Sequence, residues 1–425
     1  MSLVVMKFGG TSLASAERVE RVADRLVRHK EAGDKVIAVV SAMGKSTDDL
    51  VQLANTINTN PPAREMDVLM SAGEQISMAV LAMAVESRGC KALSFSGAQA
   101  GIITDDEYSK AKIREIQADR LFYALDKGYI VIVAGFQGVT RSGDITTLGR
   151  GGSDTTAVAV AAAVGADVCE IYTDVDGVYT ADPRVCPRAQ KVDVIGYDDM
   201  LELADSGSGV LQSRSVEFAK NFGVVIHCRS AFNNNPGTLV KEVSLMESAI
   251  ISGIAYDNSE AKITIRDAPD EVGVAANVFS RVAGSGANVD MIVQNVSENG
   301  HTDISFTTPL RDLPKVRQLL DTFVEEIGAR SFVIDKSISK VSVVGAGMKT
   351  NPGIAAKAFA TLADNGINIT MITTSSIRLS VVIDESQAQR AVQCLHSAFG
   401  LDADTIFEET QLSSEELAAK AQKGR

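Results

Sequence analysis

The 425-residue sequence contains no tryptophan, five cysteines, four histidines and nine prolines. The cysteines are scattered, odd in number and without a C-x-x-C pair, so the sequence predicts neither a disulfide framework nor a zinc site. No two histidines stand at ligand spacing, which disfavours a histidine-based metal site or catalytic triad. We therefore expect reduced cysteines and no dedicated metal site in the protein.

Positive charge is also scarce, because 41 Lys and Arg face 54 Asp and Glu for a formal net charge of -13. This balance argues against nucleic acid or an anionic membrane as the main partner, since both attract basic surfaces. The longest apolar runs, such as residues 155–168, are shorter than the roughly 20 residues of a transmembrane helix. The N-terminus lacks the pattern of a signal peptide, so we expect a cytoplasmic protein.

The remaining composition, 45% hydrophobic and 22% charged, is that of a globular protein, and about 150 residues per domain suggests roughly three domains. Up to about residue 240, short β-rich runs alternate with helical patterns, which predicts a parallel sheet covered by helices. Long buried helices are expected at Met66–Ser87 and Asp154–Val164. The expected strands are Leu3–Phe8, Lys35–Ser41, Ala92–Phe95, Ile130–Ala134, Glu170–Thr173 and Val224–Cys228.

The C-terminal part contains an internal repeat. Residues 273–276 (GVAA) recur as 353–356 (GIAA), and residues 286–292 (GANVDMI) recur as 366–372 (GINITMI), both with an offset of 80. Each copy has the order strand, helix, strand, strand, helix of a ferredoxin-like βαββαβ unit. The second copy lacks a clear last strand, and a spare strand at Ile250–Tyr256 could fill that edge and interlock the copies. Duplicated packing alone would also explain a repeat.

A glycine pair follows the first strand in Lys7-Phe-Gly-Gly-Thr-Ser12 and leads into a helix. Glycines let the backbone approach an anion, helix N-terminal N–H groups point at it, and a lysine adds positive charge. Phosphate is the natural ligand of such a loop, although a strand followed by Gly-Gly also fits a simple tight turn. The Walker A pattern G-x-x-x-x-G-K-[ST] does not occur in the sequence.

A second glycine-rich cluster spans residues 146–156 (TTLGRGGSDTT). Arg150 can bind a carboxylate through two hydrogen bonds, and Ser153 and Asp154 stand at the start of a helix. Capping alone would explain Ser153 and Asp154. Three glycines and an arginine around one helix start exceed what capping needs, so the cluster favours an anion site.

The third cluster, residues 172–184 (YTDVDGVYTADPR), is a strand end followed by a polar loop. It lacks the glutamate and the flanking helices of a calcium loop, and Tyr179 and Arg184 fit a nucleotide-binding loop better. Two smaller pieces fit the same pocket: residues 41–44 (SAMG) with Thr47, and residues 71–74 (SAGE). A buried Glu74 would suit an ammonium group, although a surface carboxylate is the default interpretation of a single glutamate.

Together these motifs, in this order, resemble the motif series of aspartate kinases of the amino-acid kinase superfamily, and the repeats resemble the paired ACT domains of its monofunctional members. The resemblance covers essentially the whole chain and leaves no room for a homoserine dehydrogenase. It implies a three-layer αβα kinase domain with a mainly parallel sheet, followed by two ferredoxin-like ACT domains. The implied boundaries are 1–245 for the kinase domain, 261–335 for the first ACT domain, 250–260 plus 336–413 for the second, and 414–425 for a polar tail.

The resemblance implies ATP-dependent phosphorylation of the side-chain carboxylate of L-aspartate to 4-phospho-L-aspartate, the first step of lysine, threonine and methionine biosynthesis. Mg²⁺ would arrive with ATP. Catalysis is assigned to Lys7 and Asp154. The implied aspartate-binding residues are Ser41, Thr47, Glu74, Arg150, Gly151 and Ser153. The implied nucleotide-binding residues are Lys7, Gly9, Gly10, Ser12, Thr173, Asp174, Tyr179 and Arg184.

Relatives usually carry a basic residue at the position of Gly209, so the resemblance predicts weaker ATP binding here. The ACT copies imply feedback inhibition by threonine and/or lysine. Val274 and Ser376 stand where some lysine-sensing relatives have acidic side chains, which favours threonine, alone or in concert. The implied effector-binding residues are Asp270, Gly273, Val274, Ala275, Asn288, Asp290, Gln294, Ile354, Ala355, Asn368, Ile369, Thr374 and Ser375.

Two partner expectations and two alternatives complete the sequence-based interpretation. The chain is expected to form a homo-oligomer through its ACT domains, and Met246 could start a separate regulatory subunit, as in some relatives. The alternatives are a kinase for another amino acid, such as glutamate or acetylglutamate, and a catalytically silent amino-acid sensor on a kinase fold. Gly209 is the one feature that favours the sensor.

Overall fold

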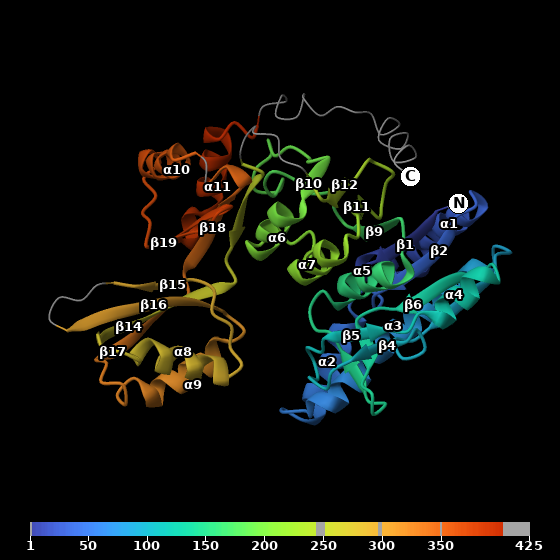
Figure 1. Cartoon of the computed structure of the whole chain (residues 1–425), viewed down its shortest axis with the longest axis horizontal. Helices are drawn as coiled ribbons and strands as arrows, with labels where there is room; N and C mark the ends of the chain where they lie inside the picture. Colours follow the sequence, from blue (N-terminus) through green and yellow to red (C-terminus); the bar gives the residue numbers. More distant parts are fainter. Residues whose placement is uncertain (1, 244–250, 296–299, 349–350, 403–425) are drawn as a thin grey trace. The chain divides into compact units, whose positions relative to one another are not determined.

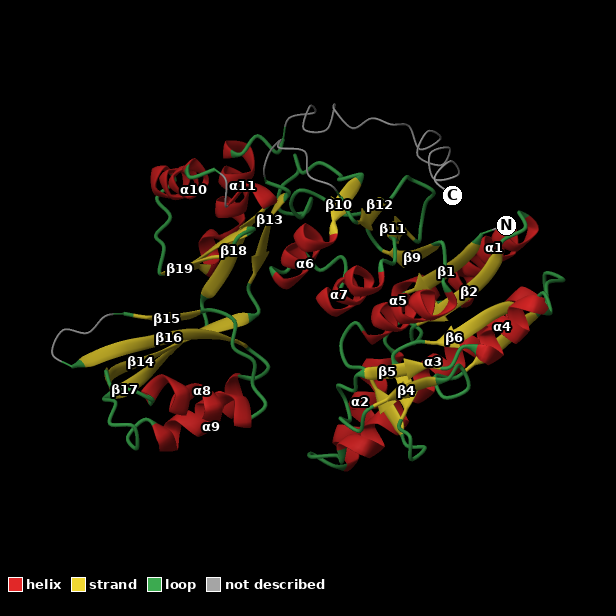
Figure 2. Ribbon diagram, in the orientation of Figure 1, coloured by secondary structure: helices red, strands yellow, loops and turns green. Residues whose placement is uncertain are grey.

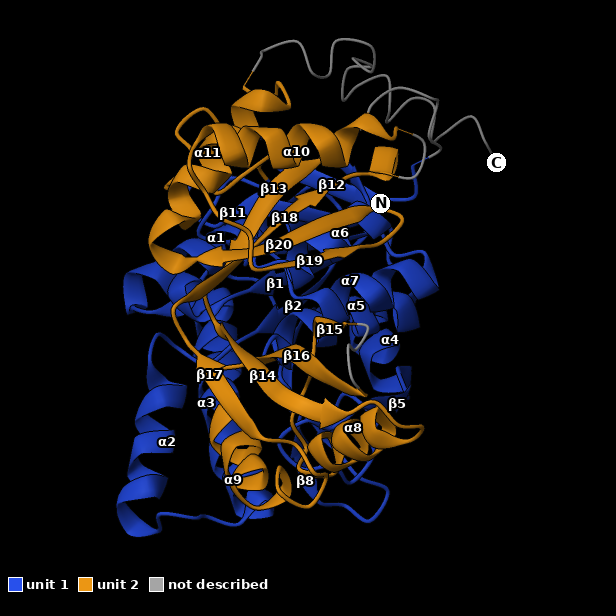
Figure 3. Ribbon diagram, turned by 90° about the vertical axis from the view of Figure 1, so that its left-hand side faces the viewer, with its two compact units in different colours: residues 1–178, 191–248 blue, residues 179–190, 249–425 orange. Residues whose placement is uncertain are grey.

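The computed structural model describes residues 2–243, 251–295, 300–348 and 351–402. The contacts within the chain divide it into two compact units (Figure 3). The first unit comprises residues 1–178 and 191–248, and the second comprises residues 179–190 and 249–425. The segment 179–190 thus interrupts the sequence of the first unit but makes its contacts in the second unit.

An eight-stranded sheet forms the centre of the first unit, in the order β10-β12-β11-β9-β1-β2-β6-β3 (Figure 1). Neighbouring strands run parallel except β11 and β12, which are antiparallel. This mainly parallel sheet confirms the predicted fold class. The strands are β1 (Leu3–Phe8), β2 (Lys35–Val40), β3 (Ala92–Phe95), β6 (Ile130–Ala134), β9 (Val168–Thr173), β10 (Val194–Gly196), β11 (Ile226–Ser230) and β12 (Thr238–Lys241).

Helices cover the sheet because its strands are apolar on both faces. Helix α1 (Ala16–Glu31) places Val19, Val22, Ala23 and Leu26 in one buried cluster with residues of β1 and β2. Helix α5 (Gly152–Val164) is buried along nearly its whole length and contacts β1, β9 and α7. The other helices are η1 (Gly10–Leu13), α2 (Ser46–Ile57), α4 (Asp119–Asp126), α6 (Tyr197–Asp205) and α7 (Ser213–Phe222).

Helix α3 (Ala63–Glu86) is long and apolar enough, by length and composition, to cross a membrane. Its buried residues nevertheless include the carboxylates Asp67 and Glu74, and it packs against α1, β3, β6 and β8. Carboxylates buried against protein are typical of a core helix rather than of a lipid-facing one. Beside it lies a small sheet in the order β5-β4-β7-β8. Its strands are β4 (Ile102–Thr104), β5 (Ile113–Ile116), β7 (Gln137–Val139) and β8 (Ile145–Thr147).

The second unit contains two four-stranded sheets, each with helices of its own (Figure 2). The first copy has the order β15-β16-β14-β17, and the second has β13-β18-β20-β19. The first copy comprises β14 (Glu260–Pro269), α8 (Val274–Gly284), β15 (Ile292–Gln294), β16 (His301–Pro309), α9 (Leu313–Phe323) and β17 (Ser331–Asp335). The second comprises β18 (Ile338–Val344), η2 (Ala346–Met348), α10 (Gly353–Asp364), β19 (Met371–Thr374), β20 (Arg378–Asp384), η3 (Glu385–Gln387) and α11 (Ala388–Ala398).

Strand β13 (Gly253–Asp257) precedes the first copy in sequence but pairs antiparallel with β18 of the second. It occupies the edge that the second copy's missing last strand leaves open. The six predicted strands of the first unit are present within about two residues of their predicted ends. The small sheet, β10 and β12 were not predicted. Four of these six strands have only three residues, which carry too little alternation to be recognised.

Candidate active site

The loops that follow the central parallel strands gather the predicted site at one edge of the sheet. Phe8, the last residue of β1, pairs with Val40 and Tyr172, and Val40 pairs with Ala134. The strands β1, β2, β6 and β9 therefore end side by side. In open α/β sheets ligands bind outside the carboxyl ends of the strands, so this edge is the candidate site.

An ion pair joins the first strand to helix α5 at this edge. Lys7 Nζ lies 2.5 Å from Asp154 Oδ1, and the two side chains are only 13% and 10% exposed. Asp154 stands in the first turn of α5. This helix begins directly after Gly151, whose φ of 70° is left-handed and suits glycine. A shielded ammonium group thus lies beside a helix N-terminus, where free N–H groups attract anions.

Two glycine-containing loops pack closely against each other beside Lys7. Gly44 N donates a hydrogen bond to Gly10 O over 3.0 Å, and Ser41 N donates to Phe8 O over 3.1 Å. A Cβ atom on Gly10 would lie 2.8 Å from Ala42 O, which leaves no room for a larger residue. A Cβ atom on Gly9 would lie 3.5 Å from Lys7 Nζ. The glycine backbone therefore passes directly beside the ammonium group.

Glu74 is buried next to the same loop. Its Oε1 accepts a hydrogen bond from Ala42 N over 3.1 Å, and the residue is 3% exposed. Its Oε2 is buried without a hydrogen-bond partner among the described residues. Burial raises the pKa of Glu74 from 4.5 to about 7, against the lowering effect of the backbone hydrogen bonds. The carboxyl group is therefore poised to accept a cationic partner.

Two residues that no motif marks hold the loop before α5. Asp67 of α3 accepts hydrogen bonds from Thr147 N over 2.8 Å and from Thr147 Oγ1 over 2.7 Å. Arg214 of α7 donates to Leu148 O and to Ala111 O, each over 2.8 Å. The sequence analysis did not identify Asp67 or Arg214, because each acts through a partner distant in sequence.

The remaining predicted aspartate-binding residues lie near this loop and its neighbours. Ser153 is buried in the first turn of α5. A Cβ atom added to Gly135, which follows β6, would lie 2.9 Å from the Cβ atom of Ser153. Arg150 is exposed and immediately precedes Gly151. Thr47 is half-buried in the first turn of α2. The structure thus brings Ser153 to the strand ends and leaves Arg150 open to solvent.

The predicted nucleotide-binding residues divide between the two units. Thr173 ends β9 and donates a hydrogen bond to Asp174 Oδ1 over 3.1 Å. Ser12 is 3% exposed in η1, and its Oγ has no hydrogen-bond partner among the described residues. Tyr179 and Arg184 belong to the segment 179–190 of the second unit. Their role in nucleotide binding stays a prediction.

Gly209, where the resemblance predicts a basic residue, is exposed with a left-handed φ of +68°. Among the described residues, a Cβ atom there would meet only Gly207 O, at 3.8 Å. The site therefore has space for a side chain but a backbone conformation that costs a non-glycine residue about 1 kcal/mol.

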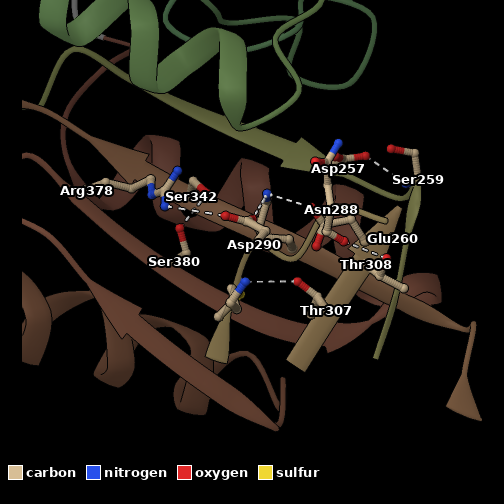
Figure 4. A network of polar contacts seen from close by, with 12 residues as sticks. Asp257, Ser259, Glu260, Asn288, Asp290, Thr307, Thr308, Ser342, Arg378 and Ser380 are labelled. Carbon is tan, nitrogen blue, oxygen red and sulfur yellow. Dashed lines mark hydrogen bonds and ion pairs between the residues drawn. The ribbon is translucent and has the colours of Figure 1, made fainter. Parts of the chain in front are cut away.

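A charge network centred on the buried Lys340 joins the two ACT copies within the second unit (Figure 4). Lys340 of β18, 2% exposed at its side chain, contacts Glu260 Oε1 at 3.0 Å and Asp290 Oδ2 at 2.5 Å. Arg378 of β20 lies 3.9 Å from Asp290 Oδ1. Burial raises the pKa of Glu260 in spite of Lys340, whereas the two carboxylates raise the pKa of Lys340 in spite of burial. We conclude that Lys340 stays charged between the two carboxylates.

Asp290 is thus the predicted effector residue with a defined partner in the other copy. The structure places most of the other predicted effector residues on the surface, at the first turns of α8 and α10 and around the edge strands β15 and β19. The exposed ones are Asp270, Gly273, Asn288, Gln294, Asn368, Thr374 and Ser375. Val274, Ala275, Ile354, Ala355 and Ile369 are half-buried.

Comparisons with known proteins agree with this architecture. The model of the amino acid kinase family matches residues 2–230, and models of the ACT domain match residues 263–327 and 341–399. The aspartokinase of Mycolicibacterium smegmatis is 52% identical over 410 residues, which cover 95% of this chain and 97% of that protein. The aspartokinase of Corynebacterium glutamicum is 50% identical over 410 residues, with the same coverage.

Solved structures give the same result. The structure of E. coli aspartokinase III in complex with aspartate and ADP superposes with a TM-score of 0.80 at 26% identity and covers 94% of this chain and 100% of that one. The same enzyme in complex with lysine and aspartate gives a TM-score of 0.73 at 26% identity, covering 93% and 99%. The chain therefore belongs to the aspartokinase family, with an amino-acid kinase domain followed by two ACT domains.

Proposed function

We propose that this chain transfers the γ-phosphoryl group of ATP to the side-chain carboxylate of L-aspartate and forms 4-phospho-L-aspartate. The observation that carries the proposal is the shielded Lys7–Asp154 ion pair, 2.5 Å long, between the Gly9-Gly10 loop and the N-terminus of α5. A fixed ammonium group beside backbone N–H donors suits a phosphoryl group in transfer, whose oxygens carry negative charge.

The acceptor carboxylate needs no strong general base, because an aspartate side chain with a pKa of about 4 is already ionised at neutral pH. The task of the protein is alignment and charge neutralisation. Lys7 stabilises the charge on the transferring oxygens, and Gly9 and Gly10 donate backbone N–H groups to them. Asp154 orients the ammonium group of Lys7. Mg²⁺, which enters with ATP, neutralises further phosphate charge.

The substrate aspartate is held through its carboxylate and ammonium groups. Arg150 binds a carboxylate of aspartate through two hydrogen bonds. Glu74 pairs with the ammonium group, for which its unpaired buried oxygen is suited. The remaining contacts come from Ser41, Thr47, Gly151 and Ser153.

ATP is held by Lys7 with Gly9, Gly10 and Ser12 at its phosphates, and by Thr173 and Asp174 together with Tyr179 and Arg184 of the segment 179–190. The buried and unpaired hydroxyl of Ser12 is available for a phosphate oxygen. Among the described residues, no group of three or more His, Cys, Asp or Glu could hold a metal ion.

The ACT copies provide feedback inhibition by an end-product amino acid. Val274 and Ser376, both neutral, offer no negative charge to a lysine ammonium group, which favours threonine, alone or together with lysine. Calorimetric titration with each amino acid tests this proposal, and a response to lysine alone would contradict it. We also propose a cytoplasmic homo-oligomer assembled through the ACT copies. Met246, the proposed start of a separate subunit, lies outside the described residues.

A hydroxamate assay with ATP, Mg²⁺ and either aspartate or glutamate tests the function. We expect aspartyl hydroxamate from the wild-type chain, and almost none from Lys7→Met. Lys127→Met is the matched control, because Lys127 is an exposed lysine at the end of α4. An equal rate with glutamate would assign the chain to another substrate. No product under any condition would refute the enzyme and leave the silent sensor, which Gly209 favours.

A further inference from the structure

The segment 179–190 is bound to the second ACT copy although the residues on both sides of it belong to the first unit. Val178 N donates a hydrogen bond to Thr238 Oγ1 over 2.8 Å within the first unit. Two residues later, Thr180 O accepts a hydrogen bond from Ile254 N of β13 over 2.7 Å within the second unit. The chain therefore passes from contacts within the first unit to contacts within the second unit over two residues, at the start of this segment.

Apolar side chains of the segment are part of the core of the second ACT copy. Ala181, Val185 and Cys186 are 4%, 7% and 4% exposed. They share one hydrophobic cluster with Val392 and Leu395 of α11. A surface loop does not normally contribute to the core of another domain, so this segment is built into the ACT copy rather than resting on it.

Two side chains of helix α11 hold the segment by hydrogen bonds. Gln393 Nε2 donates to Val185 O over 2.7 Å. His396 Nε2 lies 2.8 Å from Thr180 Oγ1, and His396 is fully buried. Thr180 Oγ1 also accepts a hydrogen bond from Gln190 N over 2.9 Å, which closes the two ends of the segment onto each other. His396 therefore bonds to the base of the loop, and Gln393 bonds to its middle.

We propose that Gln393 and His396 are positioning residues for ATP, because they fix the segment that carries Tyr179 and Arg184 to the second ACT copy. The proposal rests on the proposed function, in which Tyr179 and Arg184 contact the nucleotide. Neither Gln393 nor His396 touches a reacting group. They act through the backbone of the segment.

The same cluster contains the half-buried effector candidates Ile354, Ala355 and Ile369, packed against its buried residues. A continuous apolar core thus runs from the proposed effector pocket of the second copy to the nucleotide segment.

The test uses the full-length variants Gln393→Ala and His396→Leu, with Gln387→Ala as the matched control. Gln387 is the last residue of η3 and directly precedes α11. It also donates to a backbone oxygen, but to Gly366 O of its own copy. We expect both test variants to raise the KM for ATP threefold or more, with the KM for aspartate changed less than twofold. The control is expected to leave both constants unchanged, and His396→Gln, which retains a hydrogen-bonding group, is expected to recover part of the loss.

Trypsin provides a readout that does not depend on activity, because the segment contains two arginines, Arg184 and Arg188. We expect cleavage at these sites to accelerate several-fold in Gln393→Ala and His396→Leu but not in Gln387→Ala. If the wild-type chain is active and the test variants keep its KM for ATP, this inference alone is overturned. Equal changes in the KM for ATP and the KM for aspartate would also overturn it. An inactive wild-type chain would refute the proposed function, whereas unchanged cleavage would show that α11 does not hold the segment.

Discussion

Titration of Glu74 is expected to control the binding of aspartate near neutral pH. Burial raises the pKa of Glu74 to about 7, and only the ionised carboxylate can pair with the substrate ammonium group. With that pKa the ionised fraction is about 0.9 at pH 8 and about 0.1 at pH 6. We therefore expect the KM for aspartate to rise about tenfold when the pH falls from 8 to 6.

The same group makes folding stability depend on pH in the opposite sense. The folded-state pKa of about 7 lies above the ordinary value of 4.5, so the folded chain binds more protons between these two values. The stabilisation from the neutral carboxyl is complete below the unfolded pKa and is lost as the pH rises through about 7. The full difference corresponds to about 3 kcal/mol, at roughly 1.4 kcal/mol per pKa unit.

Steady-state kinetics at pH 6, 7 and 8, together with thermal unfolding at the same pH values, measure both effects. Glu74→Gln keeps an oxygen for Ala42 N but cannot ionise, so we expect a high KM for aspartate without this pH dependence. Glu86→Gln, at the exposed end of the same helix, is the control and is expected to behave as wild type. A flat wild-type profile, or the same tenfold change in Glu74→Gln, would refute the reasoning.

Three further predictions follow from single residues. Lys7→Met is expected to lower kcat at least 100-fold, since it removes the charge beside the transferring phosphoryl group; a loss below tenfold in the hydroxamate assay would contradict this role. Gly209→Lys is expected to lower the KM for ATP several-fold and to destabilise the first unit by about 1 kcal/mol, because its φ is +68°; an unchanged KM would refute the first part. Lys340→Met is expected to destabilise the second unit by about 3 kcal/mol, because Glu260 and Asp290 lose their shared buried partner. Thermal unfolding measures this loss, which Glu260→Gln in the same chain would reduce; no change in melting temperature would show that the network contributes nothing.

Local sequence patterns determined the architecture of this protein. Alternating strand and helix patterns identified the main strands of the parallel sheet, because buried parallel strands are continuous apolar runs. The offset of 80 residues identified two copies of one unit, since each copy must bury the same helix faces against its sheet. Motifs after the strands placed Lys7, Ser41 and Thr173 at one edge, because parallel strands end on the same side.

Tertiary structure alone decided which side chains support and connect the sites. Asp67 and Arg214 have no local signature, because their partners lie far along the chain. Glu260 and Lys340 are separated by the repeat offset of 80, so equivalent positions of the two copies carry opposite charges that pair only when the copies meet. The segment 179–190 follows the same rule. Its sequence indicates a loop, but its place in the ACT core depends on α11, some 200 residues later.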